Sequence, residues 1–149
     1  MKLSRLLLGL GLAVVLAGQT SCVSRYMAGL RYSAQKGDAE DQTELGICYF
    51  YGKGVPTNYV EAVKWFRQAA EQNYALAQAW LGSCYHDGDG VATNYVEALS
   101  WFGKAAAQSN AWAQSTLGAC YATGHGVPTN YVEAVKWWRK AAEQNYTQA

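Results

Sequence analysis

The chain has 149 residues, about the length of one domain. Half of the residues are hydrophobic and only 15% are charged, so the composition excludes a disordered tail and predicts a folded core. The formal net charge of +1 lacks the basic excess typical of proteins that bind nucleic acid, and that class is excluded as well. Six Trp, eleven Tyr and fifteen Gly beside only two Pro indicate regularly spaced turns and aromatic anchors.

Residues 1–21 have the pattern of an export signal. Lys2 and Arg5 precede the apolar run of residues 6–17, which is shorter than the roughly 20 residues that a membrane-spanning helix needs. The signal predicts an exported protein. No later stretch of the sequence reaches spanning length.

Two cleavage sites fit this signal. The residues before Cys22 resemble the cleavage box of bacterial lipoproteins, in which the cysteine becomes acylated, but Gln19 stands where that box usually has Leu. The alternative is ordinary cleavage after Ala17. The first site implies a periplasmic or outer-membrane-attached lipoprotein anchored through Cys22, and the second implies a protein that is periplasmic or secreted without an anchor.

The remainder of the chain repeats with a fixed period of 36 residues. The three copies are residues 39–74, 75–110 and 111–146, and more than half of their aligned columns are identical in all three. Residues 22–38 form a linker and a degenerate leading helix that matches the closing helix of a repeat. Residues 147–149 match only the start of a fourth copy.

Each copy predicts two helices joined by a Gly-Xaa-Gly-Val loop. In the second copy the first helix is marked by apolar and small residues at helical spacing and stops at Gly88. Asn94 is the predicted N-cap of the second helix, with Glu97 at the capping-box position. We expect Gly82 to allow close helix approach, and Tyr85 and Trp101 to fill the space between layers.

A single helix pair cannot bury its apolar face, whereas stacked pairs can. The sequence therefore predicts an all-α fold, an α–α superhelix (solenoid) of three helix-turn-helix repeats. The pattern A-x5-L-G-x2-Y-x2-G-x-G-V-x2-N-x3-A-x2-W-x3-A-A resembles the Sel1-like repeat, a relative of the tetratricopeptide repeat, over residues 39–146. This resemblance implies a non-catalytic adaptor or scaffold, without a cofactor, that binds a protein or peptide on its concave face.

The cysteines of the three copies share one column, at Cys48, Cys84 and Cys120. Equivalent helices in stacked repeats lie roughly 8–10 Å apart at their axes, beyond the roughly 7 Å that a disulfide bridge spans between Cα atoms. We expect three reduced, buried packing residues. A metal site is also not expected, because Cys84 and His86 diverge on their helix and no second Cys-His pair exists.

Other short motifs carry weak predictions. Asp87 and Asp89 stand like the start of a calcium loop, but the twelfth position is Ala98 rather than Glu. Ser33 and Lys36 match the nucleophile motif of penicillin-binding enzymes, whose two companion motifs are absent. His86 and His125 are the only histidines, and both are expected to be solvent-side polar residues without a catalytic partner.

The columns that differ among the copies identify a candidate binding site. They recur along one face of the first helix, opposite the Leu-Gly-Tyr core face, and in stacks of tetratricopeptide type this face lines the inner curve. Drift of an unconstrained surface is the alternative explanation. The binding stripe comprises Glu40, Thr43, Ile47, Phe50, Tyr51, Leu76, Ala79, Ser83, His86, Asp87, Trp112, Ser115, Ala119, Ala122 and Thr123.

The predicted function is therefore a protein- or peptide-binding adaptor of the cell envelope. Two alternatives stay open: a periplasmic enzyme of the penicillin-interacting, β-lactamase-like kind, and a purely structural repeat unit that self-associates through its unfinished C-terminal end.

Overall fold

The computed structural model describes residues 23–146, so the predicted signal of residues 1–21, Cys22 and residues 147–149 lie outside the described residues. The described part contains helices and no strand, which confirms the all-α class. A helix of residues 23–35 comes first, followed by α2 (Ala39–Tyr51), α3 (Tyr59–Glu71), α4 (Ala75–Asp87), α5 (Tyr95–Ala107), α6 (Ala111–Thr123) and α7 (Tyr131–Tyr146).

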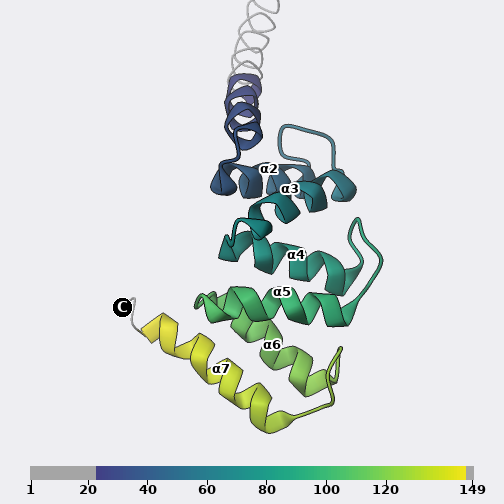
Figure 1. Cartoon of the computed structure of the whole chain (residues 1–149), viewed down its shortest axis with the longest axis vertical. Helices are drawn as coiled ribbons and strands as arrows, with labels where there is room; N and C mark the ends of the chain where they lie inside the picture. Colours follow the sequence, from purple (N-terminus) through teal and green to yellow (C-terminus); the bar gives the residue numbers. More distant parts are fainter. Residues whose placement is uncertain (1–22, 147–149) are drawn as a thin grey trace, which may run out of the picture.

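The helices stack in chain order into a superhelix, with the helix of residues 23–35 at one end and α7 at the other (Figure 1). Each repeat is an antiparallel pair, α2 with α3, α4 with α5, and α6 with α7, and the second helix of one pair packs against the first helix of the next. No described helix is both long and apolar enough to cross a bilayer.

The turns within each repeat form as their residues predict. The helix α4 ends at Gly88, whose φ of 84° lies in the left-handed region that favours glycine. Asn94 caps α5 by accepting a hydrogen bond from the Glu97 backbone N–H at 3.1 Å. The second bond of a capping box, from the Asn94 backbone N–H to the Glu97 side chain, does not form. The Asn94 N–H donates instead to the Tyr85 carbonyl (2.8 Å), and the Glu97 side chain accepts from Trp101 Nε1 (3.0 Å).

The expected close approach at Gly82 is confirmed, but the partner ring is not the expected one. Phe102 is fully buried against Gly82, and a Cβ on this glycine would lie only 2.9 Å from its Cδ1 atom. Tyr85 and Trp101 are half-buried and pack against the edges of the core clusters, so they fill the layer only in part. At its exposed edge Trp101 donates from Nε1 to Glu97, and Lys104 Nζ lies 3.8 Å from the Trp101 ring centroid.

Buried glutamines connect the repeats. Gln78 on α4 donates from Nε2 to the Ala70 carbonyl at the end of α3 (3.2 Å), and its Oε1 accepts from Gln108 Nε2 after α5 (2.8 Å). The same two bonds recur in the other copies, and we call the set the glutamine ladder: Gln42, Gln78 and Gln114 on the first helices with Gln72, Gln108 and Gln144 on the second-helix side. Each rung adds a side-chain donor to a helix-end carbonyl that also accepts a backbone N–H, as the Ala70 carbonyl does from Asn73 (3.0 Å).

The helix of residues 23–35 packs on α2 as α3 packs on α4. Its residues Met27, Leu30 and Ala34 form one buried cluster with Leu45 and Cys48. The Ala34 carbonyl accepts the first rung of the glutamine ladder at 3.0 Å. This helix therefore covers the apolar face of the first repeat, where a preceding repeat would otherwise be needed.

Candidate functional site

Most of the predicted binding stripe is accessible. Its exposed members are Glu40, Tyr51, Leu76, Asp87, Trp112, Ser115, Ala119 and Thr123, and its half-buried members are Ile47, Phe50, Ser83, His86 and Ala122. Thr43 and Ala79 are instead buried, at 1% and 0% exposure. Thr43 bonds the Ala39 carbonyl within its own helix (2.7 Å), and Ala79 packs in a core cluster with Phe102 and Leu117, so neither side chain can meet a partner directly.

Aromatic rings form a continuous line across the first two repeats and onto the third. This aromatic row consists of Phe50, Tyr51, Tyr59, Trp80 and Trp112. Phe50 contacts Tyr59 and Trp80 with ring centroids 4.9 and 5.3 Å apart, and Trp80 contacts Trp112 at 5.1 Å in an edge-to-face arrangement. The row therefore joins α2, α4 and α6 through ring contacts, and its outer rings stay accessible, with Tyr51, Tyr59 and Trp112 exposed by 57%, 42% and 38%.

Trp80 anchors this row and is absent from the predicted stripe. Its ring stacks on the fully buried Phe66 at 5.4 Å with planes 10° apart, so the core holds it in place. Glu44, Trp80 and Thr116 occupy one column of the repeats, four residues after the column of Leu76. Variation of that column, together with its i,i+4 spacing, is the sequence signal that identifies it.

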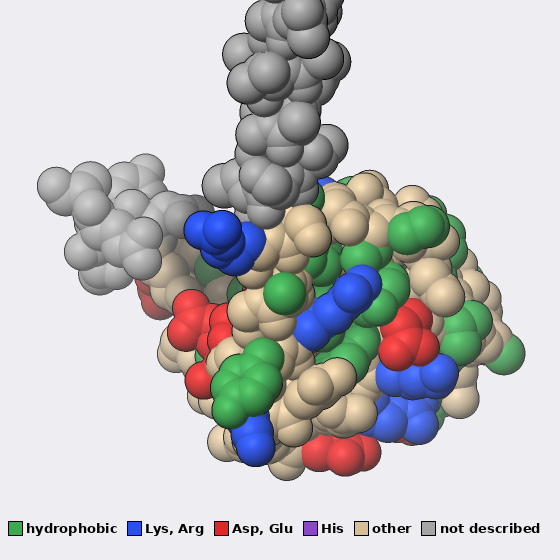
Figure 2. All heavy atoms as spheres, turned by 90° about the horizontal axis from the view of Figure 1, so that it is seen from above, with side chains coloured by type: hydrophobic (Ala, Val, Ile, Leu, Met, Phe, Trp, Pro, Cys, Tyr) green, Lys and Arg blue, Asp and Glu red, His purple; other side chains and the backbone are tan. Residues whose placement is uncertain are grey.

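Charged side chains of both signs lie on or near the stripe, and Lys53 Nζ lies 5.3 Å from the Tyr51 ring centroid. Glu40 is exposed at one end of the stripe, and the Asp87 side chain is 53% exposed near the other. Burial, followed by the nearby Glu40 and Asp38 carboxylates, raises the pKa of Tyr74 above its ordinary value of 10.0. At the end of the stack seen in Figure 2, Lys and Arg side chains lie beside Asp and Glu, and no single sign of charge dominates that face.

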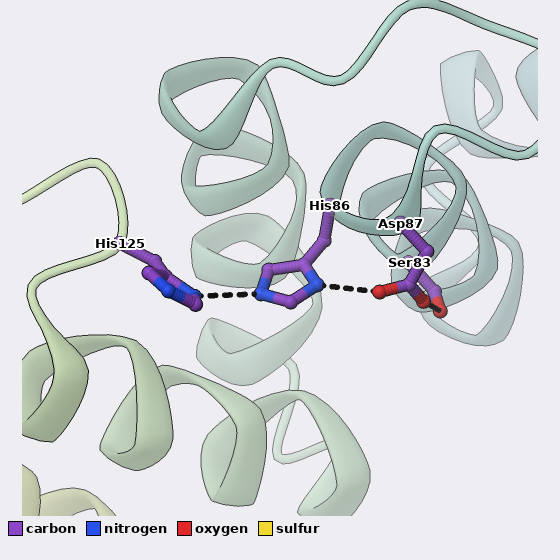
Figure 3. A network of polar contacts seen from close by, with 4 residues as sticks. All are labelled: Ser83, His86, Asp87 and His125. Atoms are coloured by element: carbon purple, nitrogen blue, oxygen red, sulfur yellow. Dashed lines mark hydrogen bonds and ion pairs between the residues drawn. The ribbon is translucent and has the colours of Figure 1, made fainter.

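Both histidines are half-buried and contact each other, although the sequence predicts two solvent-side polar residues. His86, in the last turn of α4, and His125, in the loop between α6 and α7, approach with Nε2 and Nδ1 3.1 Å apart. His86 Nδ1 also lies 2.6 Å from Asp87 Oδ1, and Ser83 donates to Asp87 Oδ2 (Figure 3). The histidines occupy different columns of different repeats, so only the stacking of the repeats brings them together.

The cysteines lie in the core. Cys48, Cys84 and Cys120 are free and buried in the structure. Burial is the main cause that raises all three pKa values, and for Cys84 burial, followed by the Asp89 and Asp87 carboxylates, raises the pKa to about 12. Protonated, buried thiols are poor nucleophiles.

Residues 23–146 hold no group of three or more His, Cys, Asp or Glu side chains that could bind a metal ion. The candidate calcium-loop residue Asp87 is held instead by His86 and Ser83. Of the candidate nucleophile pair, Lys36 lies over the Tyr32 ring, 5.5 Å from its centroid.

The helix pairs, their Gly-bounded loops and their buried glutamines recur with one period, and a family model matches that period. The Sel1 repeat model matches residues 39–74, 75–110 and 113–146. The chain belongs to the Sel1 repeat family. Sel1 repeats commonly serve as protein-interaction scaffolds, and their fold is typically non-enzymatic.

Solved bacterial structures share this Sel1 fold. A protective antigen of uropathogenic Escherichia coli with an SLR fold is 38% identical, with a TM-score of 0.80 over 82% of this chain and 26% of that one. A Sel1 repeat protein from Oxalobacter formigenes is 38% identical, with a TM-score of 0.70 over 72% of this chain and 44% of that one. The chain thus spans less than half of either relative.

Helicobacter pylori cysteine rich protein B shows the fold alone, at 19% identity and a TM-score of 0.64 over 83% of this chain and 89% of that one. No curated protein matches the chain.

Proposed function

We propose that this Sel1 repeat chain is a non-catalytic adaptor of the bacterial cell envelope that binds a protein or peptide on the stripe formed by its first helices. The observation that carries the proposal is the aromatic row, which runs unbroken over α2, α4 and α6 and keeps its outer rings exposed. Large aromatic side chains on a rigid support are the residues that most often dominate binding energy at protein interfaces.

The partner we propose is a peptide segment with an apolar anchor and a basic residue beside it. The apolar anchor would lie on the exposed rings of Tyr51 and Trp112, which leave a wide apolar contact area. The basic residue would face Glu40 or Asp87, the exposed carboxylates at the two ends of the stripe. Charges of this kind set orientation and association rate more than affinity.

Truncation of Trp112 tests this surface. We expect Trp112→Ala to weaken partner binding by about 2 kcal/mol, or about thirtyfold, because it removes the exposed end of the aromatic row. The helical content should not change, since the Trp112 column holds Glu40 in the first repeat. A photo-crosslinking residue at position 112, followed by purification from the native envelope, identifies the partner, whose affinity for wild type and variant is then measured by calorimetry.

Val96→Ala is the matched control. Val96 is 68% exposed on α5, outside the stripe, so its truncation removes accessible apolar area without touching the aromatic row. A photo-crosslinker at position 96 should capture no partner. Equal loss of affinity in folded Trp112→Ala and Val96→Ala proteins would refute the assignment of the binding surface.

Anchoring through Cys22 is part of the proposal for the envelope. If Cys22 is acylated, Cys22→Ser should move the protein from the membrane fraction to the aqueous fraction, because each buried methylene of a lipid chain contributes about 0.8 kcal/mol. A wild-type protein found only in the aqueous fraction would favour cleavage after Ala17.

A second candidate, self-association, rests on the outer face of α7. Val63 of α3 is 4% exposed beneath the following repeat, whereas the equivalent Val135 is 49% exposed, and Tyr131 is 70% exposed against 42% for the equivalent Tyr59. This face could pack a further helix pair, including one from a second copy. Sedimentation tests it: a mass that rises with protein concentration in the wild type and not in Val135→Asp would support self-association.

A further inference from the structure

Two imidazole rings face each other across the boundary between the second and third repeats (Figure 3). Their nearest nitrogens, His86 Nε2 and His125 Nδ1, are 3.1 Å apart, and the ring centroids are 5.3 Å apart. For two imidazoles whose nitrogens are 3.1 Å apart, a centroid separation of 5.3 Å is close to the maximum. The two nitrogens therefore lie almost on the line that joins the ring centroids. The arrangement is that of a direct N–H···N hydrogen bond.

The partners of His86 fix where its protons lie. Asp87 Oδ1 lies 2.6 Å from His86 Nδ1, and a carboxylate only accepts, so Nδ1 carries a proton that it donates to Asp87. Only one proton can then lie between His86 Nε2 and His125 Nδ1. The neutral pair has that proton on His125 Nδ1, whereas the singly charged pair has it on His86 Nε2 and places the cation beside the Asp87 carboxylate.

A second excess proton does not fit this contact. With both imidazoles charged, His86 Nε2–H and His125 Nδ1–H would point at each other across 3.1 Å, with no acceptor between them. The surroundings offer little to offset the second charge. Asp87 on α4 already pairs with His86, and Tyr95 on α5, which stacks on the His125 ring at 4.6 Å, carries no formal charge. Asp89 in the α4–α5 loop lies close enough to Cys84 to raise its pKa.

We propose that His86 and His125 form a proton-regulated latch between the second and third repeats. The latch is closed while the pair holds no excess proton or one, and it opens when both imidazoles are charged. Acidification opens the latch, because it supplies the second excess proton that the contact cannot hold. Opening moves the loop of residues 124–127 away from the C-terminal end of α4.

A bound metal ion explains the geometry less well than a proton. Two nitrogens that share a tetrahedral metal direct their lone pairs at a third point away from the line between them, whereas these rings point along that line. The described residues also supply no third ligand of the His, Cys, Asp or Glu type. Asp87 lies on the far side of the His86 ring, where it orients the imidazole.

The latch bears on the proposed binding stripe because His86 belongs to it, and this further step rests on the proposed function. Acidification would change the end of the stripe at Asp87 while leaving the aromatic row on α2 and α4 intact. Partner affinity should therefore fall on acidification in the wild type and not in a variant without the latch.

The latch itself is tested without a partner, by NMR of the imidazole nitrogens and backbone amides between pH 8 and 4.5. In the wild type we expect the two rings to take up protons in two successive steps, and the amides of residues 124–127 to shift with the second step. In His125→Asn, His86 should titrate in one step, and the loop shifts should be lost. In Asp87→Asn, the first step should move to lower pH, because the cation loses its carboxylate partner.

Three outcomes would overturn the latch. One is that His86 titrates identically in the wild type and in His125→Asn. Another is that the amides of residues 124–127 in the wild type ignore the second protonation, a readout that needs no variant to fold. The last is that Zn²⁺ at neutral pH binds the wild type stoichiometrically and perturbs both rings, which would assign the pair to a metal. Pull-down of a partner with no pH dependence, beside a normal two-step titration, would refute only the link to the binding stripe.

Discussion

The substitution Gly82→Ala tests the close contact that holds each repeat together. Gly82 lies within α4, and an added Cβ would stand 2.9, 3.0 and 3.1 Å from three ring atoms of Phe102. Phe102 is only 1% exposed and is packed in a core cluster, so its ring cannot yield without disturbing neighbours. Overpacking of this kind costs about 1–3 kcal/mol of unfolding free energy.

The helix itself would gain from the same change, because alanine in a helix interior is favoured over glycine by about 1 kcal/mol. Gly103 separates the two effects. It lies within α5, and a Cβ there would meet nothing within 4 Å, so Gly103→Ala should stabilise the protein by about 0.5–1 kcal/mol. The unfolding free energies of the two variants should therefore differ by about 1–3 kcal/mol, with Gly82→Ala the less stable.

Urea unfolding followed by circular dichroism measures this difference, and the variants Phe102→Leu and Gly82→Ala/Phe102→Leu complete a double-mutant cycle. Removing the ring should recover part of the cost of the alanine, as a coupling energy of about 0.5–3 kcal/mol between contacting residues. A Gly82→Ala protein as stable as Gly103→Ala would refute the packing argument, since it would mean that the helices separate freely at this point.

Three further predictions concern buried groups. Gln78→Met keeps the side-chain volume but removes the hydrogen bonds to the Ala70 carbonyl and from Gln108, which each keep a bond with Asn73. We therefore expect a loss of about 0.5–1.5 kcal/mol in urea unfolding, whereas a change below the measurement error would show that the ladder is dispensable. Burial raises the pKa of Cys84 from 9.0 to about 12, so the stability that the neutral thiol contributes is complete below pH 9 and is lost as the pH rises towards 12. Cys84→Ala should therefore lose less stability between pH 8 and 11 than the wild type, and equal losses would contradict this. All three described thiols should react with a thiol reagent in denaturant without reductant, and a blocked pair would contradict the free state of the cysteines.

The features that the sequence predicts correctly are local. The end of α4 at Gly88 and the Asn94 cap depend on residues within a few positions, and the repeat shows each of them three times. The choice of Phe102 over Trp101 for the core was not predictable from spacing, because the two adjacent residues fit the same apolar pattern. The first repeat makes the same choice without a bond from Trp to Glu, since Phe66 is fully buried and Trp65 Nε1 has no hydrogen-bond partner.

The candidate site was less predictable because its contacts join different repeats. His86 and His125 are 39 residues apart and belong to different columns, so a column-by-column comparison of the copies does not pair them. Ala79 and Thr43 vary among the copies and yet are buried, because small residues of different type fit the same space. Variation among copies therefore indicates where the fold is tolerant, and accessibility must come from the stacking.

The glutamine ladder gives the molecule a particular mechanical character. Each rung ties a first helix to the helix before it and to the second helix of its own repeat, and no rung reaches past an adjacent repeat. A load applied at the two ends would accordingly be carried by the rungs in series, so that the weakest one yields first while the others keep their spacing. Under tension the repeats should therefore unfold one at a time, each at its own rupture force.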